Sequence, residues 1–131
     1  MVKILFNKLV RDKLRKVYQQ AGQKVVYRKL SKTEYAEALK RKIIEETNEI
    51  PTTGSPDEIA SELADVQQVI DDLAVASDVS KSQIEVIRQR KFDEKGGFGG
   101  ATFVETLELR DDDTKWIEYY RKRADRHPEI K

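Results

Sequence analysis

The sequence predicts an all-α protein, a bundle of four or five helices with a possible small β-ribbon beside them. Three serines each precede a Glu or Gln by three residues at the start of a segment with helical apolar spacing, which is typical of capping boxes. Acids repeat at i, i+3 inside two of these segments, Glu46 with Glu49 and Glu62 with Asp65. At 131 residues the chain has the length of one domain, so we expect residues 1–131 to form a single unit.

Residues that start and stop helices mark each helical segment. Capping serines precede the second, third and fourth segments, and Pro56 occupies the first helical position of the third, where its missing N–H costs nothing. Gly22 ends the first segment, and Gly96 with Gly97 ends the fourth. The expected helices cover residues 8–20, 32–49, 56–77, 81–94 and 114–126.

Two short segments are predicted as strands. Residues 25–30 (VVYRKL) and 101–109 (ATFVETLEL) are β-branched and aromatic with partial alternation. They can pair into a ribbon, although the sequence does not define a pairing or a register. The chain after residue 100 is therefore expected to hold a C-terminal strand and helix over residues 101–126.

The composition excludes several classes of partner. The 25 basic and 24 acidic residues give a formal charge of +1, which provides no global field for nucleic acid or an anionic membrane. The absence of cysteine excludes disulfides, zinc–thiolate sites and a Cys nucleophile. No apolar run reaches the roughly 20 residues of a membrane span, so we expect a cytoplasmic protein without membrane or nucleic-acid partners.

The four paired acids lie close to the apolar faces of their helices. At about 100° per residue, Glu46 and Glu49 fall near the azimuth of Leu39, and Glu62 lies within the apolar stripe with Asp65 at its edge. If the two helices pack together, the four carboxylates converge, and buried carboxylates need partners or a cation. We therefore expect a hard cation there. The alternative is a solvated acidic ridge with i, i+4 pairs to lysines.

Ligands that are all oxygen favour Mg²⁺, with Mn²⁺ or Ca²⁺ as the other hard cations. Mg²⁺ binds substrate phosphates together with a few carboxylates, so the pattern favours phosphate-ester or phosphoanhydride chemistry. Glu45 lies about 100° around the helix from Glu46 and is a candidate general base that orients a water. A solvated glutamate paired with Gln or Lys is the alternative for this residue.

Candidate phosphate ligands are basic residues near these helices. Arg88, Lys91 and Lys95 share one helix face, where they are either substrate ligands or solvated surface charges. Arg11 is the fourth candidate, because it lies within an apolar stripe where its guanidinium could hold a phosphate or the neighbouring Asp12.

Three motifs in order carry a resemblance to a known family. They are NKLVRDKL at residues 7–14, then Glu45-Glu46-x-x-Glu49 followed after 12 residues by Glu62-x-x-Asp65, and RKFDEKGGF at residues 90–98. This set resembles the all-α nucleoside triphosphate pyrophosphohydrolases of MazG type, which include phosphoribosyl-ATP pyrophosphohydrolase-like proteins. The resemblance places the core of the domain at about residues 7–98.

The resemblance implies hydrolysis of a nucleoside triphosphate, or a similar nucleotide, to the monophosphate and pyrophosphate. It also implies Mg²⁺ held by Glu46, Glu49, Glu62 and Asp65, and a homodimer or homotetramer in which neighbouring helices complete the core. Two alternatives stay open. One is a non-catalytic helical module that acts as a dimeric regulator, and the other is a hydrolase specific for phosphoribosyl-ATP.

Overall fold

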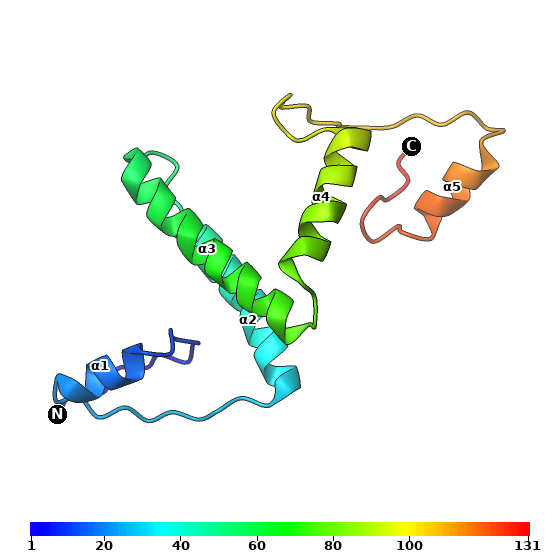
Figure 1. The fold of residues 1–131 in the computed structure, drawn as a ribbon. Helices are drawn as coiled ribbons and strands as arrows, with labels where there is room; N and C mark the ends of the chain where they lie inside the picture. The colour runs from blue at the N-terminus through cyan, green and yellow to red at the C-terminus, as the bar shows by residue number, and fades with distance from the viewer. The chain divides into compact units, whose positions relative to one another are not determined.

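The structure is a computed structural model that describes residues 1–131. It contains five α-helices and no strand, which confirms the all-α fold class. The chain divides into two units, Met1–Glu94 and Lys95–Lys131, which we describe separately (Figure 1). The helices are α1 (Leu14–Gln20), α2 (Lys32–Asn48), α3 (Pro56–Ala76), α4 (Lys81–Lys95) and α5 (Thr114–Arg121).

Side-chain caps begin the three longest helices, as the sequence predicts. The Ser31 hydroxyl accepts a hydrogen bond from the Glu34 backbone N–H at 3.2 Å, and the Glu34 carboxylate accepts one from the Ser31 N–H at 3.3 Å. Ser80 and Gln83 make the same reciprocal pair before α4, at 3.1 and 2.8 Å. Ser55 caps α3 by accepting one bond from the backbone three residues on. Each cap satisfies N–H groups that have no partner inside the helix, and typically contributes about 1 kcal/mol.

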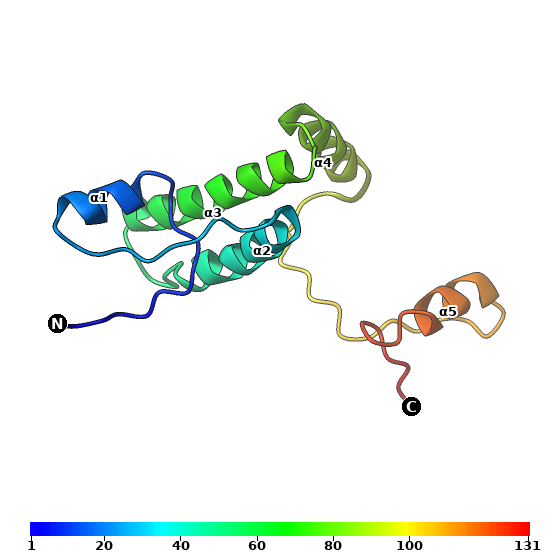
Figure 2. The ribbon, with the colours of Figure 1, turned by 90° about the horizontal axis from the view of Figure 1, so that it is seen from below.

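Helices α2 and α3 form an antiparallel hairpin, the only pair of helices with extensive mutual packing. They lie side by side in both views (Figure 1 and Figure 2). Leu39 of α2 is 3% exposed and Ala74 of α3 is 8% exposed, and these are the two fully buried residues of the chain. In the connecting loop, a Cβ at Gly54 would approach Pro51 Cγ to 2.9 Å, so glycine permits the tight return. The hairpin thereby sets the last turn of α2 beside the first half of α3.

The first helix is shorter than predicted, because it begins at Leu14 and not at residue 8. Asn7 has a left-handed backbone with φ of 43°, and no side chain caps α1. The side chains of Lys8 and Arg11 instead form ion pairs with acids of the hairpin, which holds this part of the chain in a turn against it. Gly22, with φ of 80°, follows the end of α1 as predicted.

The predicted β-ribbon is wrong, because neither residues 25–30 nor residues 101–109 form a strand. Neither segment forms the ladder of backbone hydrogen bonds by which a strand satisfies its N–H and C=O groups. Tyr27 contacts α1 through its side chain, with the Arg15 guanidinium 4.2 Å from the ring centroid. β-Branched and aromatic composition is therefore not sufficient here to form a sheet.

The C-terminal unit holds the aromatic helix α5, which ends at Arg121 and not near residue 126 as predicted. Arg123 donates to the Tyr119 carbonyl at 3.0 Å, and its guanidinium lies 3.8 Å from the Tyr119 ring centroid. Arg121 binds Glu129 at 3.1 Å, which draws the following residues back toward the helix. The Arg123 bond satisfies one carbonyl in the last turn of α5. None of the five helices combines the length and the apolar character needed to cross a bilayer.

Candidate metal centre

Three of the predicted metal ligands meet near the loop end of the α2–α3 hairpin. Glu46 and Glu49 lie one turn apart at the C-terminal end of α2, and Glu62 faces them from α3. One carboxylate oxygen from each lies within 4.8 Å of the other two. The i, i+3 spacing on α2 and the antiparallel return of the chain bring the three acids together.

The three carboxylates differ in their burial. The Glu46 side chain is 12% exposed and Glu62 is half-buried, whereas Glu49 lies at the surface. The Oε2 atom of Glu62 is buried and has no hydrogen-bond partner. A buried polar atom without a hydrogen bond is destabilising, because it has lost its contacts with water. A bound cation or a proton on Glu62 would offset this loss.

Mutual repulsion is visible in the electrostatics of the cluster. The negative charge of Glu46 raises the pKa of Glu49, and partial desolvation and the charge of Glu62 act in the same direction. A raised carboxyl pKa means that the site favours a bound positive charge or proton over three free carboxylates.

One lysine partly neutralises the acids. Lys42 Nζ lies 3.3 Å from the Glu46 carboxylate and 3.2 Å from that of Glu45, and its side chain is only 16% exposed. A single ammonium group leaves the three clustered carboxylates with a net negative charge. Lys42 is not among the predicted site residues, although its i, i+4 spacing to Glu46 is visible in the sequence.

The donor set fits a hard divalent cation. Glu46, Glu49 and Glu62 offer only carboxylate oxygens, from two helices that fix their spacing, and one of these oxygens lacks a donor. Mg²⁺ and Mn²⁺ accept such ligands together with waters. These three side chains are the residues that would hold the ion.

Asp65, the fourth predicted ligand, stands apart from this group. Its Oδ1 atom accepts a hydrogen bond from Arg11 Nη2 at 2.6 Å, and its side chain is 35% exposed. The structure therefore pairs two predicted site residues with each other, across 54 positions of sequence. The Arg11 side chain pairs with Asp65 and forms no hydrogen bond or ion pair with the neighbouring Asp12.

Glu45, the predicted general base, forms ion pairs with two lysines and is not one of the three clustered acids. Its carboxylate lies 3.2 Å from Lys42 Nζ and 3.7 Å from Lys8 Nζ. Lys8 is not among the predicted site residues, because only tertiary packing brings it to α2. The placement leaves Glu45 beside the candidate ligands without being one of them.

The three predicted phosphate ligands of α4 have no bond to the acid cluster. Arg88 binds Glu85 of its own helix, with Nε to Oε2 at 2.9 Å. Lys91 and Lys95 form no ion pair. Within the first unit, neither Arg88 nor Lys91 forms an ion pair with Glu46, Glu49 or Glu62.

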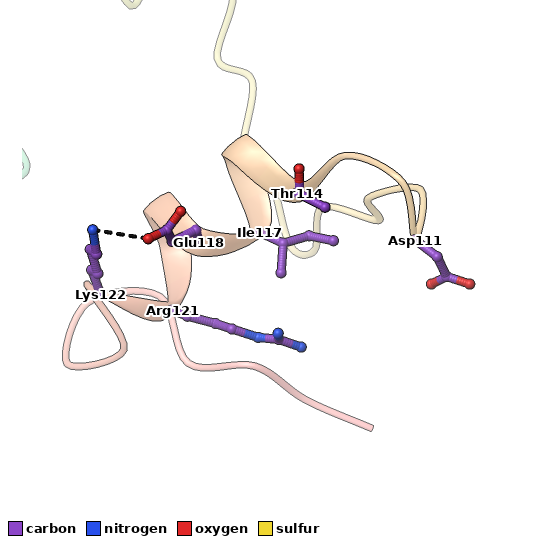
Figure 3. Close-up of a pocket in the computed structure, with 6 residues that line it drawn as sticks. All are labelled: Asp111, Thr114, Ile117, Glu118, Arg121 and Lys122. Carbon is purple, nitrogen blue, oxygen red and sulfur yellow. Dashed lines mark ion pairs between the residues drawn. The ribbon is translucent and has the colours of Figure 1, made fainter.

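A shallow hollow in the C-terminal unit contains none of the predicted site residues. It is lined by six residues of α5 and its flanks: Asp111, Thr114, Ile117, Glu118, Arg121 and Lys122 (Figure 3). The ion pair between Glu118 and Lys122, at 3.1 Å, is an exposed i, i+4 pair of a kind that contributes little energy. We assign no chemistry to this hollow.

Comparisons of the chain with protein-family models, with curated proteins and with solved structures return no match.

Proposed function

We propose that the protein hydrolyses nucleoside triphosphates, or closely similar nucleotides, to the monophosphate and pyrophosphate with the help of Mg²⁺. The observation that supports this proposal most directly is the meeting of Glu46, Glu49 and Glu62 within 4.8 Å, with one buried oxygen of Glu62 that lacks a donor. The ordered motifs of the sequence supply the reaction class, and the geometry supplies residues suited to hold the ion.

In this proposal the three glutamates hold Mg²⁺, and Asp65 is the fourth carboxylate of the site. When bound, Mg²⁺ would neutralise phosphate charge and lower the pKa of a coordinated water. Mn²⁺ has the same ligand preference and is expected to substitute. Lys42 holds the Glu46 carboxylate in place through their 3.3 Å ion pair.

Glu45 is the proposed general base. A water oxygen attacks phosphorus, the phosphoanhydride bond between the α- and β-phosphates breaks, and pyrophosphate leaves with the bridging electron pair. Glu45 accepts the proton that the water loses. Its position next to the ligands but outside their group suits this role, because a carboxylate that coordinates the metal is less available to a proton.

The triphosphate chain requires cations beyond the metal. Arg11 is the proposed phosphate ligand of the hairpin, since its guanidinium already lies at the edge of the site on Asp65, with a side chain 58% exposed. A planar guanidinium binds two phosphate oxygens at once. Arg88, Lys91 and Lys95 remain proposed ligands that must approach the phosphates from α4.

Pyrophosphate release tests the proposal directly. The purified chain is incubated with Mg²⁺ and a panel of ribo-, deoxyribo- and modified triphosphates, and with phosphoribosyl-ATP. We expect the wild-type chain to release pyrophosphate, and we expect this release to disappear in the Glu46→Gln and Glu62→Gln variants. Glu37→Gln is the matched control, because Glu37 lies on α2 and pairs with Lys40 away from the cluster.

Two outcomes would contradict the proposed activity. If Mg²⁺ stabilises the fold while no nucleotide is turned over, the cluster is a structural metal site of a non-catalytic helical module. If only phosphoribosyl-ATP is cleaved, the protein is a specific enzyme and not a general nucleotide hydrolase. Circular dichroism of each variant shows whether the helices persist.

A further inference from the structure

An aromatic pair joins the segment before α1 to that helix. Phe6 directly precedes Asn7, whose left-handed backbone, with φ of 43°, turns the chain. The Phe6 ring meets the ring of Tyr18 on α1 edge to face, with centroids 5.9 Å apart and ring planes at 80°. This is a favoured arrangement of two aromatic rings, so each ring helps to fix the position of the other.

One lysine links this aromatic pair to the acids of the hairpin. The Lys8 Nζ atom lies 5.6 Å from the centroid of the Phe6 ring and 3.7 Å from Oε1 of Glu45, the proposed general base. Three residues further on, Arg11 binds Asp65 at 2.6 Å. The segment from Phe6 to Arg11 therefore carries, in order, an aromatic ring and two cations that pair with acids of α2 and α3.

The Phe6 ring is accessible to a ligand. Its residue is 48% exposed, whereas Tyr18 is half-buried, so Tyr18 supports the pair and Phe6 presents it. Covering an exposed apolar ring with another flat ring is favourable, because both lose contact with water. Every nucleobase has such a flat ring, and stacking on an aromatic side chain binds a base whatever its identity.

We propose that the Phe6–Tyr18 pair is the nucleobase platform of the site, on which the base of the substrate stacks. The identity of this ligand rests on the proposed hydrolysis of nucleotides. The order of groups along the segment matches a nucleotide, with a ring for the base at one end and Arg11 for the phosphates at the other. The Phe6 ring has no hydrogen-bonding group. The platform therefore selects nucleotides over bare polyphosphates and accepts both purines and pyrimidines.

Calorimetric binding separates the contact with the base from the contacts with the phosphates. A nucleoside triphosphate analogue with a methylene group between its α- and β-phosphates is not cleaved there, and tripolyphosphate carries the phosphates without a base. With Mg²⁺ present, Phe6→Leu should raise the Kd of the analogue about five- to 100-fold, which corresponds to the loss of one base stack. The Kd of tripolyphosphate should stay unchanged.

Two control variants distinguish the loss of a stacking ring from a structural effect. Phe6→Trp keeps a flat aromatic ring and should bind the analogue at least as tightly as the wild type does. Phe92→Leu removes a ring of similar exposure, 52%, from α4 and should leave both dissociation constants unchanged. The platform is overturned if Phe6→Leu weakens the analogue and tripolyphosphate equally, or if Phe6→Trp loses the analogue as Phe6→Leu does.

A fluorescence measurement tests the stack without the leucine variant. The chain has a single tryptophan, so Phe6→Trp combined with Trp116→Phe leaves one reporter at the platform. The analogue should quench its emission, and tripolyphosphate should not. Equal quenching by the two ligands, or quenching by neither, overturns the platform.

The proposed hydrolysis and the platform can fail separately. If the wild type cleaves no nucleotide but binds the analogue more tightly than tripolyphosphate, and Phe6→Leu removes that difference, the platform stands without the reaction. If the wild type cleaves triphosphates and Phe6→Leu binds the analogue as the wild type does, the reaction stands and the platform is overturned. A wild-type chain that does not bind the analogue overturns both.

Discussion

Replacing Glu62 with glutamine is expected to stabilise the metal-free protein and weaken its response to Mg²⁺. Glu62→Gln keeps the shape of the side chain but removes one of three negative charges whose oxygens lie within 4.8 Å of one another. The amide NH₂ can also donate to the neighbouring carboxylates, which a glutamate cannot do. The variant therefore separates the electrostatic repulsion within the cluster from the role of the cluster in binding Mg²⁺.

The magnitude follows from the separation of Glu62 and Glu46, both at least partly buried. Two like charges within 4.8 Å repel each other by about 3.5 kcal/mol at an effective dielectric constant of 20, and by about 0.9 kcal/mol in bulk water. We therefore expect Glu62→Gln to raise the free energy of unfolding by about 1–3 kcal/mol in EDTA. For a domain of this size that corresponds to roughly 4 °C in melting temperature per kcal/mol.

Thermal unfolding in EDTA and in Mg²⁺ measures both parts of this prediction. At ten times its dissociation constant, Mg²⁺ should stabilise the wild type by about 1.4 kcal/mol. The gain should be clearly smaller for Glu62→Gln, and Glu37→Gln should behave as the wild type does. The reasoning fails if Glu62→Gln is less stable than the wild type in EDTA, or if Mg²⁺ stabilises both proteins equally.

Three further measurements test other parts of the structure. Because the pKa of Glu49 is raised above its ordinary value of 4.5 by the charge of Glu46, the folded state binds this proton more tightly than the unfolded chain. The metal-free protein should thus lose stability as pH rises from 4.5 through the raised pKa, and Glu49→Gln should remove that part of the slope in denaturant titrations. Arg11→Ala frees the Asp65 carboxylate from its 2.6 Å pair and should tighten Mg²⁺ binding several-fold by calorimetry; unchanged affinity would place Asp65 outside the site. Leu39→Ala empties the position that is 3% exposed and should cost about 2–4 kcal/mol in urea unfolding, whereas Ile44→Ala, at 61% exposure, should cost far less; equal losses would contradict this description of the core.

The local parts of the fold were predictable because their causes are local. A capping serine and the Glu or Gln three residues later interact within one turn, so Ser31 and Ser80 mark helix starts in the sequence as they do in the structure. The bounds of α2, α3 and α4 accordingly fall within one residue of the predicted ones. The i, i+3 spacing of Glu46 and Glu49 likewise places both on one face of α2 whatever surrounds it.

The errors lie where distant parts of the chain decide the outcome. Residues 8–13 have a helical apolar pattern, yet Lys8 and Arg11 reach acids of the hairpin and the segment stays in a turn. The segment at residues 25–30 has strand composition but no strand beside it. The α5 helix ends at Arg121, whose guanidinium binds Glu129 eight residues further along the chain.

By itself, the sequence determined the all-α class, three helix starts and the acids that share each helix face, because these depend on interactions over three or four residues. Only the tertiary structure decided which carboxylates meet. The hairpin brings carboxylate oxygens of Glu46, Glu49 and Glu62 within 4.8 Å of one another. Asp65 instead pairs with Arg11, which lies 54 positions away in the sequence. Helical periodicity defines a direction around one axis, but the distance between side chains on two helices depends on how the helices pack.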